Sequence, residues 1–582
     1  MSIVPRRGSA RRRLAGLTLC LALLVAACAP GPSPAASIPP APGDTPAPSS
    51  GPIACRTATP AASAGANGWW ADALFYEVFV RSFADSDGDG IGDLRGLIDR
   101  LDYLNDGDPA TSNDLGATAL WLMPVAESPS YHGYDVVDYR TVETDYGTND
   151  DFKALVAAAR TRGIRIVVDL VINHTSVQHP WFVDARTPGS AHDSWYMWEA
   201  ARPGWNGPDG QPVWHPAGDR VYYGLFSDGM PDLDLTNPAV TAELVDVARY
   251  WLDEMGVDGF RLDAAQHLIE DGATQLDTPA THEWLAAFRS TIHADRADAL
   301  VLGEVFNTRL VTASYVASGS LDLVFDFDLA GTIRNAVRLG DAASVMAAFA
   351  DLPVRYPAGG FATFLSNHDQ NRVMSEVRGD AGAARSAAAI LLTAPGVPFL
   401  YYGEELGLQG RKPDPEIRTP LPWTDALPGR GFSAGTPWEP FAPGADSATV
   451  STQDADPGSL LSSYRTLAHA RTASPALAIG ALVPAVASSG AVAAWLRTGP
   501  GETLLVIHNL SDEAVPDLRL SLPAGALCGS PSAEPVLSVP FTPGDGQGEI
   551  PGPTVEADGS VRDYAPLETV PAHSSWVIRL NP

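Results

Sequence analysis

The spacing of apolar and polar residues divides the chain into regions of different architecture. From residue 69 onward, short apolar runs alternate with segments in which apolar residues recur every three or four positions, as in amphipathic helices. The apolar runs predict eight strands, at residues 74–83, 117–125, 165–174, 257–264, 301–305, 321–327, 361–369 and 397–404. Strands that alternate with helices favour a parallel sheet, and eight of them predict a (β/α)8 TIM barrel of the α/β class.

Two segments depart from this alternation. Residues 175–237 are irregular and rich in aromatic side chains, and they are too many for a simple loop, so they predict an inserted domain above the barrel after strand three. Beyond residue 475, β-like runs separated by Pro and Gly predict a C-terminal antiparallel β-sandwich over residues 476–582. The barrel itself is then expected in two parts, residues 69–174 and 238–475.

The N-terminus has the pattern of an export signal. Five arginines precede a short apolar stretch that ends at Ala27, and this predicts a signal peptide over residues 1–27. The small residues before Cys28 resemble the lipobox of bacterial lipoproteins, which predicts lipidation of Cys28 and anchoring to the outer face of the cell membrane. An ordinary cleavage site, with a secreted product, is the alternative. Residues 28–68 contain ten prolines and predict an extended linker.

Composition narrows the choice of partner. The 582 residues are 45% hydrophobic, which is enough for large cores, and the formal net charge is −31. So negative a protein repels phosphate backbones, which argues against a nucleic-acid partner. Four cysteines are too few for a disulfide scaffold, but export would place Cys55 and Cys528 where they can pair. No segment after the signal is apolar for long enough to cross a membrane.

Three acidic residues stand at the ends of predicted strands. Asp263 ends strand four, Glu304 ends strand five and Asp369 ends strand seven. The carboxyl ends of barrel strands meet at one mouth, where clustered carboxylates push one another's pKa values apart. One acid can then stay ionised while another holds a proton, as the cleavage of a glycosidic bond requires.

Four segments carry a family resemblance. Residues 169–174, 259–267, 303–305 and 367–369 are similar, in this order, to the signature regions of the alpha-amylase family, glycoside hydrolase family 13. Residues 116–124 and 396–405 give supporting matches, and the resemblance extends from about residue 69 to the C-terminus. It implies a barrel, an inserted B domain and a C-terminal β domain, the same architecture that the apolar pattern predicts.

The resemblance also implies roles for individual residues. Asp263 matches the nucleophile, Glu304 the general acid/base, and Asp369 the acid that stabilises the transition state and holds substrate hydroxyls. Gln266 stands where many members have Lys, which leaves the preference on the product side open. The residues that match substrate-binding positions are Tyr134, Asp135, His174, Arg261 and His368.

Residues 85–93, called here the acidic loop, have the pattern of a calcium site. Their alternating carboxylates and glycines resemble the start of an EF-hand, but residue 96 is Gly where an EF-hand has Glu. Relatives bind Ca2+ in a loop of this form, and a solvated acidic turn is the alternative. A second calcium site near Asn173 and the His267 carbonyl is left open. The expected ligands are Asp85, Asp87, Asp89, Asp93 and the carbonyl of Ile91.

Together these features predict a retaining α-glucan hydrolase, an endo-acting alpha-amylase that works on starch or maltooligosaccharides as an exported monomer. Residues 230–234 resemble a motif of the group between oligo-1,6-glucosidases and neopullulanases that includes lipoprotein alpha-amylases. Residues 418–423 resemble a segment of α-glucosidases. An exo-acting α-glucosidase, an oligo-1,6-glucosidase or a neopullulanase is therefore the nearer alternative. A non-catalytic glucan-binding lipoprotein is the alternative of a different class.

Overall fold

The computed structural model describes residues 68–208, 210–540 and 549–582. The predicted signal peptide, Cys28, Cys55 and nearly all of the predicted linker lie outside the described residues. None of the described helices combines the length and the apolar character that crossing a membrane would require.

The predicted barrel is confirmed. Its strands are all parallel to their neighbours and close in the order β1-β13-β12-β11-β10-β9-β5-β2. Each strand is shorter than its predicted run, because the last residues of the run leave the sheet and form loops. The strands are β1 Phe75–Val78, β2 Ala119–Leu122, β5 Arg165–Leu170, β9 Gly259–Leu262, β10 Leu300–Gly303, β11 Leu323–Phe325, β12 Phe361–Phe364 and β13 Val397–Tyr401.

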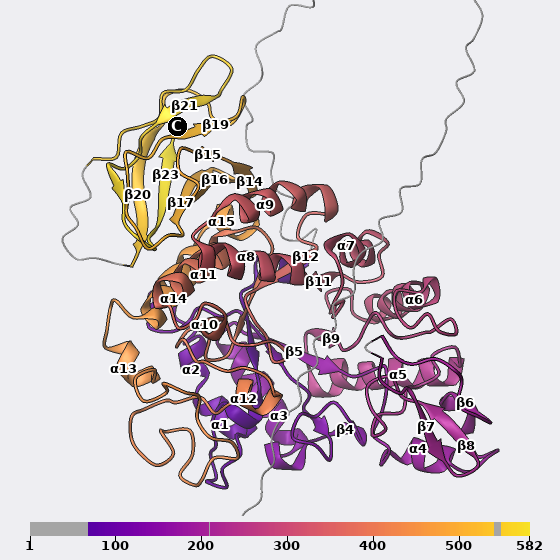
Figure 1. Cartoon of the computed structure of the whole chain (residues 1–582). Helices are drawn as coiled ribbons and strands as arrows, with labels where there is room; N and C mark the ends of the chain where they lie inside the picture. Colours follow the sequence, from indigo (N-terminus) through magenta and orange to yellow (C-terminus); the bar gives the residue numbers. More distant parts are fainter. Residues whose placement is uncertain (1–67, 209, 541–548) are drawn as a thin grey trace, which may run out of the picture. The chain divides into compact units, whose positions relative to one another are not determined.

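Helices surround the ring of strands (Figure 1). A capping box is present at Thr148, because its side chain accepts from the Asp151 N–H while the Asp151 side chain accepts from the Thr148 N–H. The helices are α1 Leu94–Asp99, α2 Leu101–Leu104, α3 Asn149–Thr161, α5 Pro238–Tyr250, α6 Pro279–Asp295, α7 Arg309–Ala317, α8 Phe327–Leu339, α9 Ala343–Arg355, α10 Val373–Glu376, α11 Ala381–Thr393, α12 Asp414–Ile417, α13 Val450–Asp454, α14 Leu460–Ala473 and α15 Pro475–Ile479.

Large side chains fill the barrel interior. Phe75 and Phe399 stack with their ring centroids 4.2 Å apart, and Trp121 and Phe325 lie beside them. A second and larger apolar cluster lies between the strands and the helices. The interior is therefore a packed core that supports the strand ends, and it is not a channel.

The segment after β5 forms a small antiparallel sheet in the order β6-β8-β7, with its own apolar cluster around Trp214 and Tyr223. An isolated bridge between His174 and Asp232 joins this segment to the end of β5. The segment therefore lies beside the carboxyl end of the barrel. Its elements are α4 Pro180–Ala185, β6 Trp198–Glu199, β7 Trp214–Ala217 and β8 Arg220–Tyr223.

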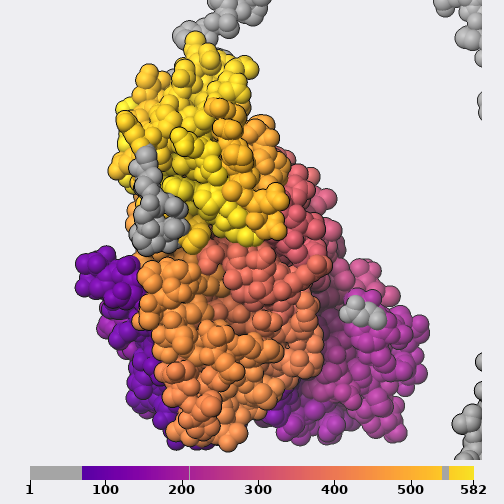
Figure 2. Space-filling view, turned by 60° about the vertical axis from the view of Figure 1, so that its left-hand side comes forward, coloured from indigo at the N-terminus to yellow at the C-terminus, as the bar shows by residue number. Residues whose placement is uncertain are grey.

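The C-terminal strands form antiparallel sheets around an apolar cluster, as the predicted β-sandwich requires. One sheet runs β14-β16-β17-β23-β20 and a smaller one runs β15-β19-β21. Figure 2 shows these residues in yellow next to the orange residues of the last part of the barrel. The strands are β14 Ala481–Pro484, β15 Val486–Ala487, β16 Val492–Gly499, β17 Glu502–Asn509, β18 Val515–Pro516, β19 Leu520–Leu522, β20 Ser532–Val539, β21 Val561–Tyr564, β22 Thr569–Val570 and β23 Ser575–Asn581.

Candidate active site

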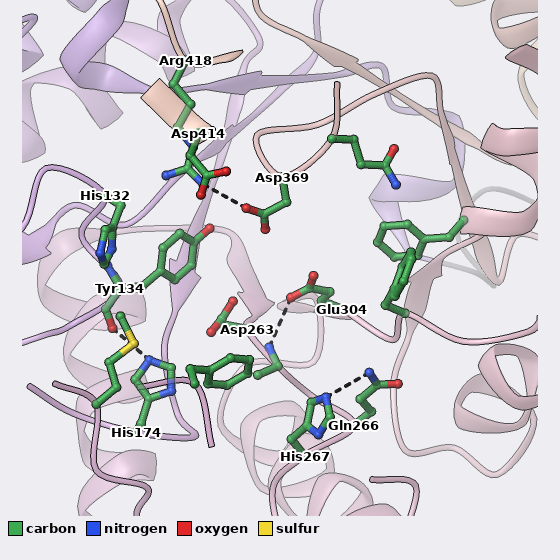
Figure 3. Close-up of a pocket in the computed structure, with 16 residues that line it drawn as sticks. His132, Tyr134, His174, Asp263, Gln266, His267, Glu304, Asp369, Asp414 and Arg418 are labelled. Carbon is green, nitrogen blue, oxygen red and sulfur yellow. Dashed lines mark hydrogen bonds and ion pairs between the residues drawn. The ribbon is translucent and has the colours of Figure 1, made fainter. Parts of the chain in front are cut away.

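A cavity of about 470 Å³ opens at the carboxyl ends of the barrel strands (Figure 3). Asp263, Glu304 and Asp369 all line it, as their positions at the ends of β9, β10 and β12 predict. Residues far apart in the sequence thus meet at one mouth. Other lining residues include His132, Tyr134, His174, Phe226, Gln266, Phe306, Phe327, Asp414 and Arg418.

Beneath the cavity, one buried guanidinium holds the acids in place. Arg261 Nη1 donates to both carboxylate oxygens of Asp169 at 2.9 Å and to Asp263 Oδ1 at 2.7 Å. Its Nη2 donates to Glu304 Oε2 at 2.6 Å. Arg261 is completely buried, and although burial opposes its charge, the surrounding acids raise its pKa further above the ordinary value. The group therefore remains a fixed positive charge.

Asp263 and Glu304 have raised pKa values. Burial is the main cause for both, while Arg261 acts in the opposite direction. Burial likewise raises the pKa of Asp169, to about 7. Both acids accept a hydrogen bond directly from Arg261, and Asp263 shares the Nη1 nitrogen with Asp169. Glu304 also accepts a hydrogen bond from the Ala264 N–H at 3.3 Å.

The pKa of Asp369 is shifted in the opposite direction. Burial would raise the pKa of its carboxyl, but His368, Arg418 and Lys412 together bring the pKa well below the ordinary value. Arg418 Nη2 donates to Asp369 Oδ1 at 2.9 Å. The cavity therefore contains one acid that is firmly ionised and two whose pKa values are raised, the division of protonation states that acid–base chemistry uses.

His368 connects Asp369 to the end of β1. Its Nδ1 donates to Glu77 Oε1 at 2.6 Å, and its Nε2 lies 3.1 Å from Asp369 Oδ2. Burial lowers the pKa of His368, but Asp369 and Glu77 outweigh it and raise the pKa to about 9. The ring is completely buried and stacks on Tyr134, so it lies behind the cavity wall. Its contact with substrate stays a prediction.

Two further predicted substrate residues differ in their placement. His174 lines the cavity, its Nε2 donates to the Tyr134 carbonyl at 3.1 Å, and burial lowers its pKa to about 4. Asp135 is not among the residues that line the cavity, and its contact with substrate stays a prediction. Its carboxylate instead accepts hydrogen bonds from Ser128 Oγ at 2.8 Å and from Ser130 Oγ, so it shapes the loop that presents Tyr134.

Several residues of the site were not predicted from the sequence. Glu77 is a lone acid within an apolar strand, a signal that could have identified it. Phe306 is 63% exposed, lines the cavity two residues after Glu304, and packs edge-on against Phe327 at 4.8 Å. Asp414 begins the short helix α12 within the long connection after β13, where no spacing rule indicates which side chains reach the mouth.

In the acidic loop, carboxylate oxygens of Asp85, Asp87 and Asp89 all lie within 4.8 Å of one another. Asp93 lies outside this group, and its role as a ligand, like that of the Ile91 carbonyl, stays a prediction. It begins α1 by accepting from the Gly96 N–H at 2.8 Å, and it also binds the main chain and the hydroxyl of Ser86.

Comparison with known proteins agrees with this geometry. The family model described as "Alpha amylase, catalytic domain" matches residues 77–480. The chain belongs to the alpha-amylase family. It is 37% identical over 458 residues to Alpha-amylase 3 of Dictyoglomus thermophilum, covering 76% of this chain and 85% of that protein. It is 30% identical over 532 residues to the oligo-1,6-glucosidase of Parageobacillus thermoglucosidasius, covering 78% and 92%.

Solved structures give the same result. The crystal structure of the alpha-amylase from H. orenii is 36% identical, with a TM-score of 0.75, and the match covers 88% of this chain and 99% of that one. As a member of this family, the protein is a glycoside hydrolase that acts on O-glycosyl bonds of glucans.

The His368 contacts predict a pH-dependent stability. A histidine whose pKa is about 6.5 in the unfolded chain and about 9 in the folded state stabilises the fold fully below pH 6.5, and this contribution is lost as the pH rises through 9. We therefore expect the melting temperature to fall between pH 6.5 and 9, and to fall less steeply in His368→Gln. His174→Gln is the matched control, because His174 is neutral throughout this range and its replacement leaves the slope unchanged. Equal slopes in wild type and His368→Gln would contradict the charged imidazolium.

Proposed function

We propose that the protein is a retaining hydrolase of α-1,4-glucosidic bonds in starch and maltooligosaccharides, acting as a monomer outside the cell. The observation that carries the proposal is the hydrogen bonding of Asp263 and Glu304 by two nitrogens of one Arg261 guanidinium. Two acids held so close favour a retaining mechanism, in which the carboxyl groups lie about 5–5.5 Å apart and leave no room for a water molecule between them and the sugar.

The proposed reaction gives the two acids different roles. Ionised Asp263 attacks the anomeric carbon while Glu304 gives its proton to the leaving glycosidic oxygen. Glu304 then takes a proton from the water molecule that releases the sugar from Asp263. Asp369 stays ionised beside Arg418 and stabilises the positive charge that develops on the sugar ring.

Two features favour an alpha-amylase. Relatives with 36% and 37% identity that align along most of the chain are named alpha-amylases. The exposed ring of Phe306 on the Glu304 side also offers a flat apolar surface to the sugar that leaves, which suits a long chain that continues past the cleavage point. An intact set of three acids argues against the alternative of a non-catalytic glucan-binding lipoprotein.

We expect Asp263→Asn to abolish hydrolysis of amylose and Glu304→Gln to lower kcat at least about a hundredfold, the range in which general acid–base catalysis contributes. The exposed acid Asp253, changed to Asn, is the matched control and retains activity. NMR of the first products shows the α-anomer if the mechanism is retaining. Wild-type rates in either catalytic variant, or a β-anomer as first product, would refute the assignment.

A second candidate function is an exo-acting α-glucosidase or oligo-1,6-glucosidase. It is favoured by the charged residues on the Asp369 side, where Asp414 pairs with Arg418 at 3.2 Å and with Lys412. Such a cluster can close the cavity beyond the first sugar. An oligo-1,6-glucosidase is among the similar proteins. A product time course on amylose, pullulan and isomaltose separates the candidates, because an exo enzyme releases glucose from the start and an endo enzyme releases mixed oligosaccharides.

We further propose that the acidic loop binds Ca2+. Its donors are carboxylate oxygens, which suit a hard cation, and their mutual distances allow them to bind one ion. Partial burial raises the pKa of Asp89, and the charges of Asp87 and Asp85 raise it further. A bound cation would relieve this repulsion. Asp85, Asp87 and Asp89 would hold the ion, which would stabilise the loop without taking part in bond cleavage.

Chelation of calcium is therefore expected to lower the melting temperature, since a ligand that binds only the folded state stabilises it. The double variant Asp87→Ala with Asp89→Ala should melt below calcium-loaded wild type and should not respond to chelator. Asp106→Ala with Asp108→Ala, in an exposed acidic turn, is the matched control and should keep the response. If the double variant has the same melting temperature as calcium-loaded wild type, both with and without chelator, the loop is only an acidic turn.

We propose that the enzyme is exported and held at the outer face of the cell membrane by lipid on Cys28. The apolar stretch before Cys28 and the ten prolines after it support this reading, because a lipid anchor needs a spacer to keep the enzyme clear of the membrane. Cys528 is disulfide-bonded, which is typical of proteins in an oxidising space outside the cell.

Fractionation of cells tests the anchor. We expect wild type in the membrane fraction and Cys28→Ala in the soluble fraction with full activity, because acyl chains contribute about 0.8 kcal/mol per buried methylene. Cys20→Ala, within the apolar stretch, is the matched control and stays with the membrane. Wild type and Cys28→Ala partitioning equally into the soluble fraction would show that Cys28 is not an anchor.

A further inference from the structure

One side of the acidic loop lies against residues 432–438, which belong to the irregular segment between α12 and α13. At one end of the loop, the Asp85 N–H donates to the Phe432 carbonyl at 2.8 Å. Near the other end, the Trp438 N–H donates to the Gly90 carbonyl at 2.9 Å. Gly90 has a φ of +97°, and a Cβ there would lie 2.0 Å from a carbonyl oxygen of this segment. The main chain of Trp438 is thus joined directly to the loop.

Trp438 is linked to Arg418 through two other residues, Ser82 and Tyr131. Its Nε1 donates to Ser82 Oγ at 3.0 Å, and Ser82 Oγ in turn donates to the Arg418 carbonyl at 2.5 Å. Its ring also stacks on Tyr131, with the centroids 5.4 Å apart and the planes 27° from parallel. The Arg418 guanidinium carbon lies 5.9 Å from the centroid of the same Tyr131 ring. Both the main chain and the side chain of Arg418 thus depend on where Trp438 lies.

Arg418 in turn belongs to the catalytic cavity. Its Nε donates to the His368 carbonyl at 3.0 Å, and its Nη2 donates to Asp369 and to Asp414. It is 2% exposed and lines the cavity beside Asp369 (Figure 3). The contacts described above therefore form a continuous path from the acidic loop to the acid that stabilises the sugar.

We propose that Trp438 is a positioning residue that couples the acidic loop to Arg418, so that a divalent cation in the loop tightens glucan binding at the Asp369 side of the cavity. The inference rests on the proposed function and adds a regulation of the same site. When the three loop carboxylates share a cation, the Gly90 carbonyl keeps Trp438 against Ser82 and Tyr131. When the cation is removed, repulsion among the carboxylates distorts the loop, and Arg418 loses its fixed position on Asp369.

The test measures binding separately from turnover. Maltoheptaose binding to Glu304→Gln, in the full chain, is followed by calorimetry with calcium and with chelator. We expect chelation to weaken binding about fivefold, the factor that corresponds to the net loss of one hydrogen bond. Adding Trp438→Phe, which keeps the stacked ring but removes the donor to Ser82, should weaken binding in calcium and reduce the response to chelator. Ser82→Ala removes the same hydrogen bond from the other side and should act alike.

The matched control is Trp69→Phe. Its indole Nε1 donates to the Asp298 carbonyl at 3.0 Å, a hydrogen bond of the same length at the opposite end of the barrel. This variant should bind maltoheptaose and respond to chelator as the Glu304→Gln parent does. In the enzyme with Glu304 intact, Trp438→Phe should raise KM while leaving kcat within about twofold, a split that general loss of stability would not give.

The outcomes separate this inference from the proposed function. If Glu304→Gln does not bind maltoheptaose in calcium, the proposed function fails. If it binds equally with and without calcium, whether or not the melting temperature changes, the coupling is overturned. The coupling is also overturned if the Trp438→Phe and Ser82→Ala variants keep the full response to chelator.

Discussion

The active site depends on the burial of one positive charge inside the barrel. A guanidinium removed from water costs several kcal/mol unless carboxylates surround it, and Arg261 is completely buried against Asp169, Asp263 and Glu304. The barrel supplies this geometry through strand register, because β5 and β9 pair with Asp169 directly opposite Arg261. Asp169 therefore neutralises Arg261 from below. The hydrogen bonds from Arg261 to Asp263 and to Glu304 then set the spacing of these two acids at the mouth.

A second group of charges, formed by Glu77, His368 and Asp369, makes the site asymmetric. Glu77 and Asp369 hold His368 as a cation, and His368 in return keeps Asp369 ionised. Asp263 and Glu304 share Arg261, and burial has the larger influence on them and raises their pKa values. The three acids thus differ in protonation because their neighbours differ, although all of them stand at strand ends.

The features that follow from local rules were predictable from the sequence. Apolar runs gave the strand positions, and an acid just after a strand marked Asp263, Glu304 and Asp369 as neighbours at the mouth. The sequence could not indicate the partner of each side chain. The carboxylates of Asp135 and Asp93 satisfy hydrogen-bond donors of their own loops, and no spacing rule separates such acids from ones that face a ligand. Residues of the irregular segment after β13 reach the site only because the chain folds back across it.

The two sides of the cavity carry different kinds of side chain, and this limits how each side can select a substrate. On the Asp369 side, Arg418 and Asp414 form ion pairs, so a sugar there meets fixed hydrogen-bonding groups and must fit them. On the Glu304 side, the exposed ring of Phe306 offers an apolar contact surface but no hydrogen-bonding group that would fix the orientation of a sugar. The chemistry at the barrel mouth is therefore compatible with several linkages and chain lengths, and related enzymes carry different names. Discrimination among glucans resides in the loop residues that flank the acids, because the acids themselves perform the same step on each.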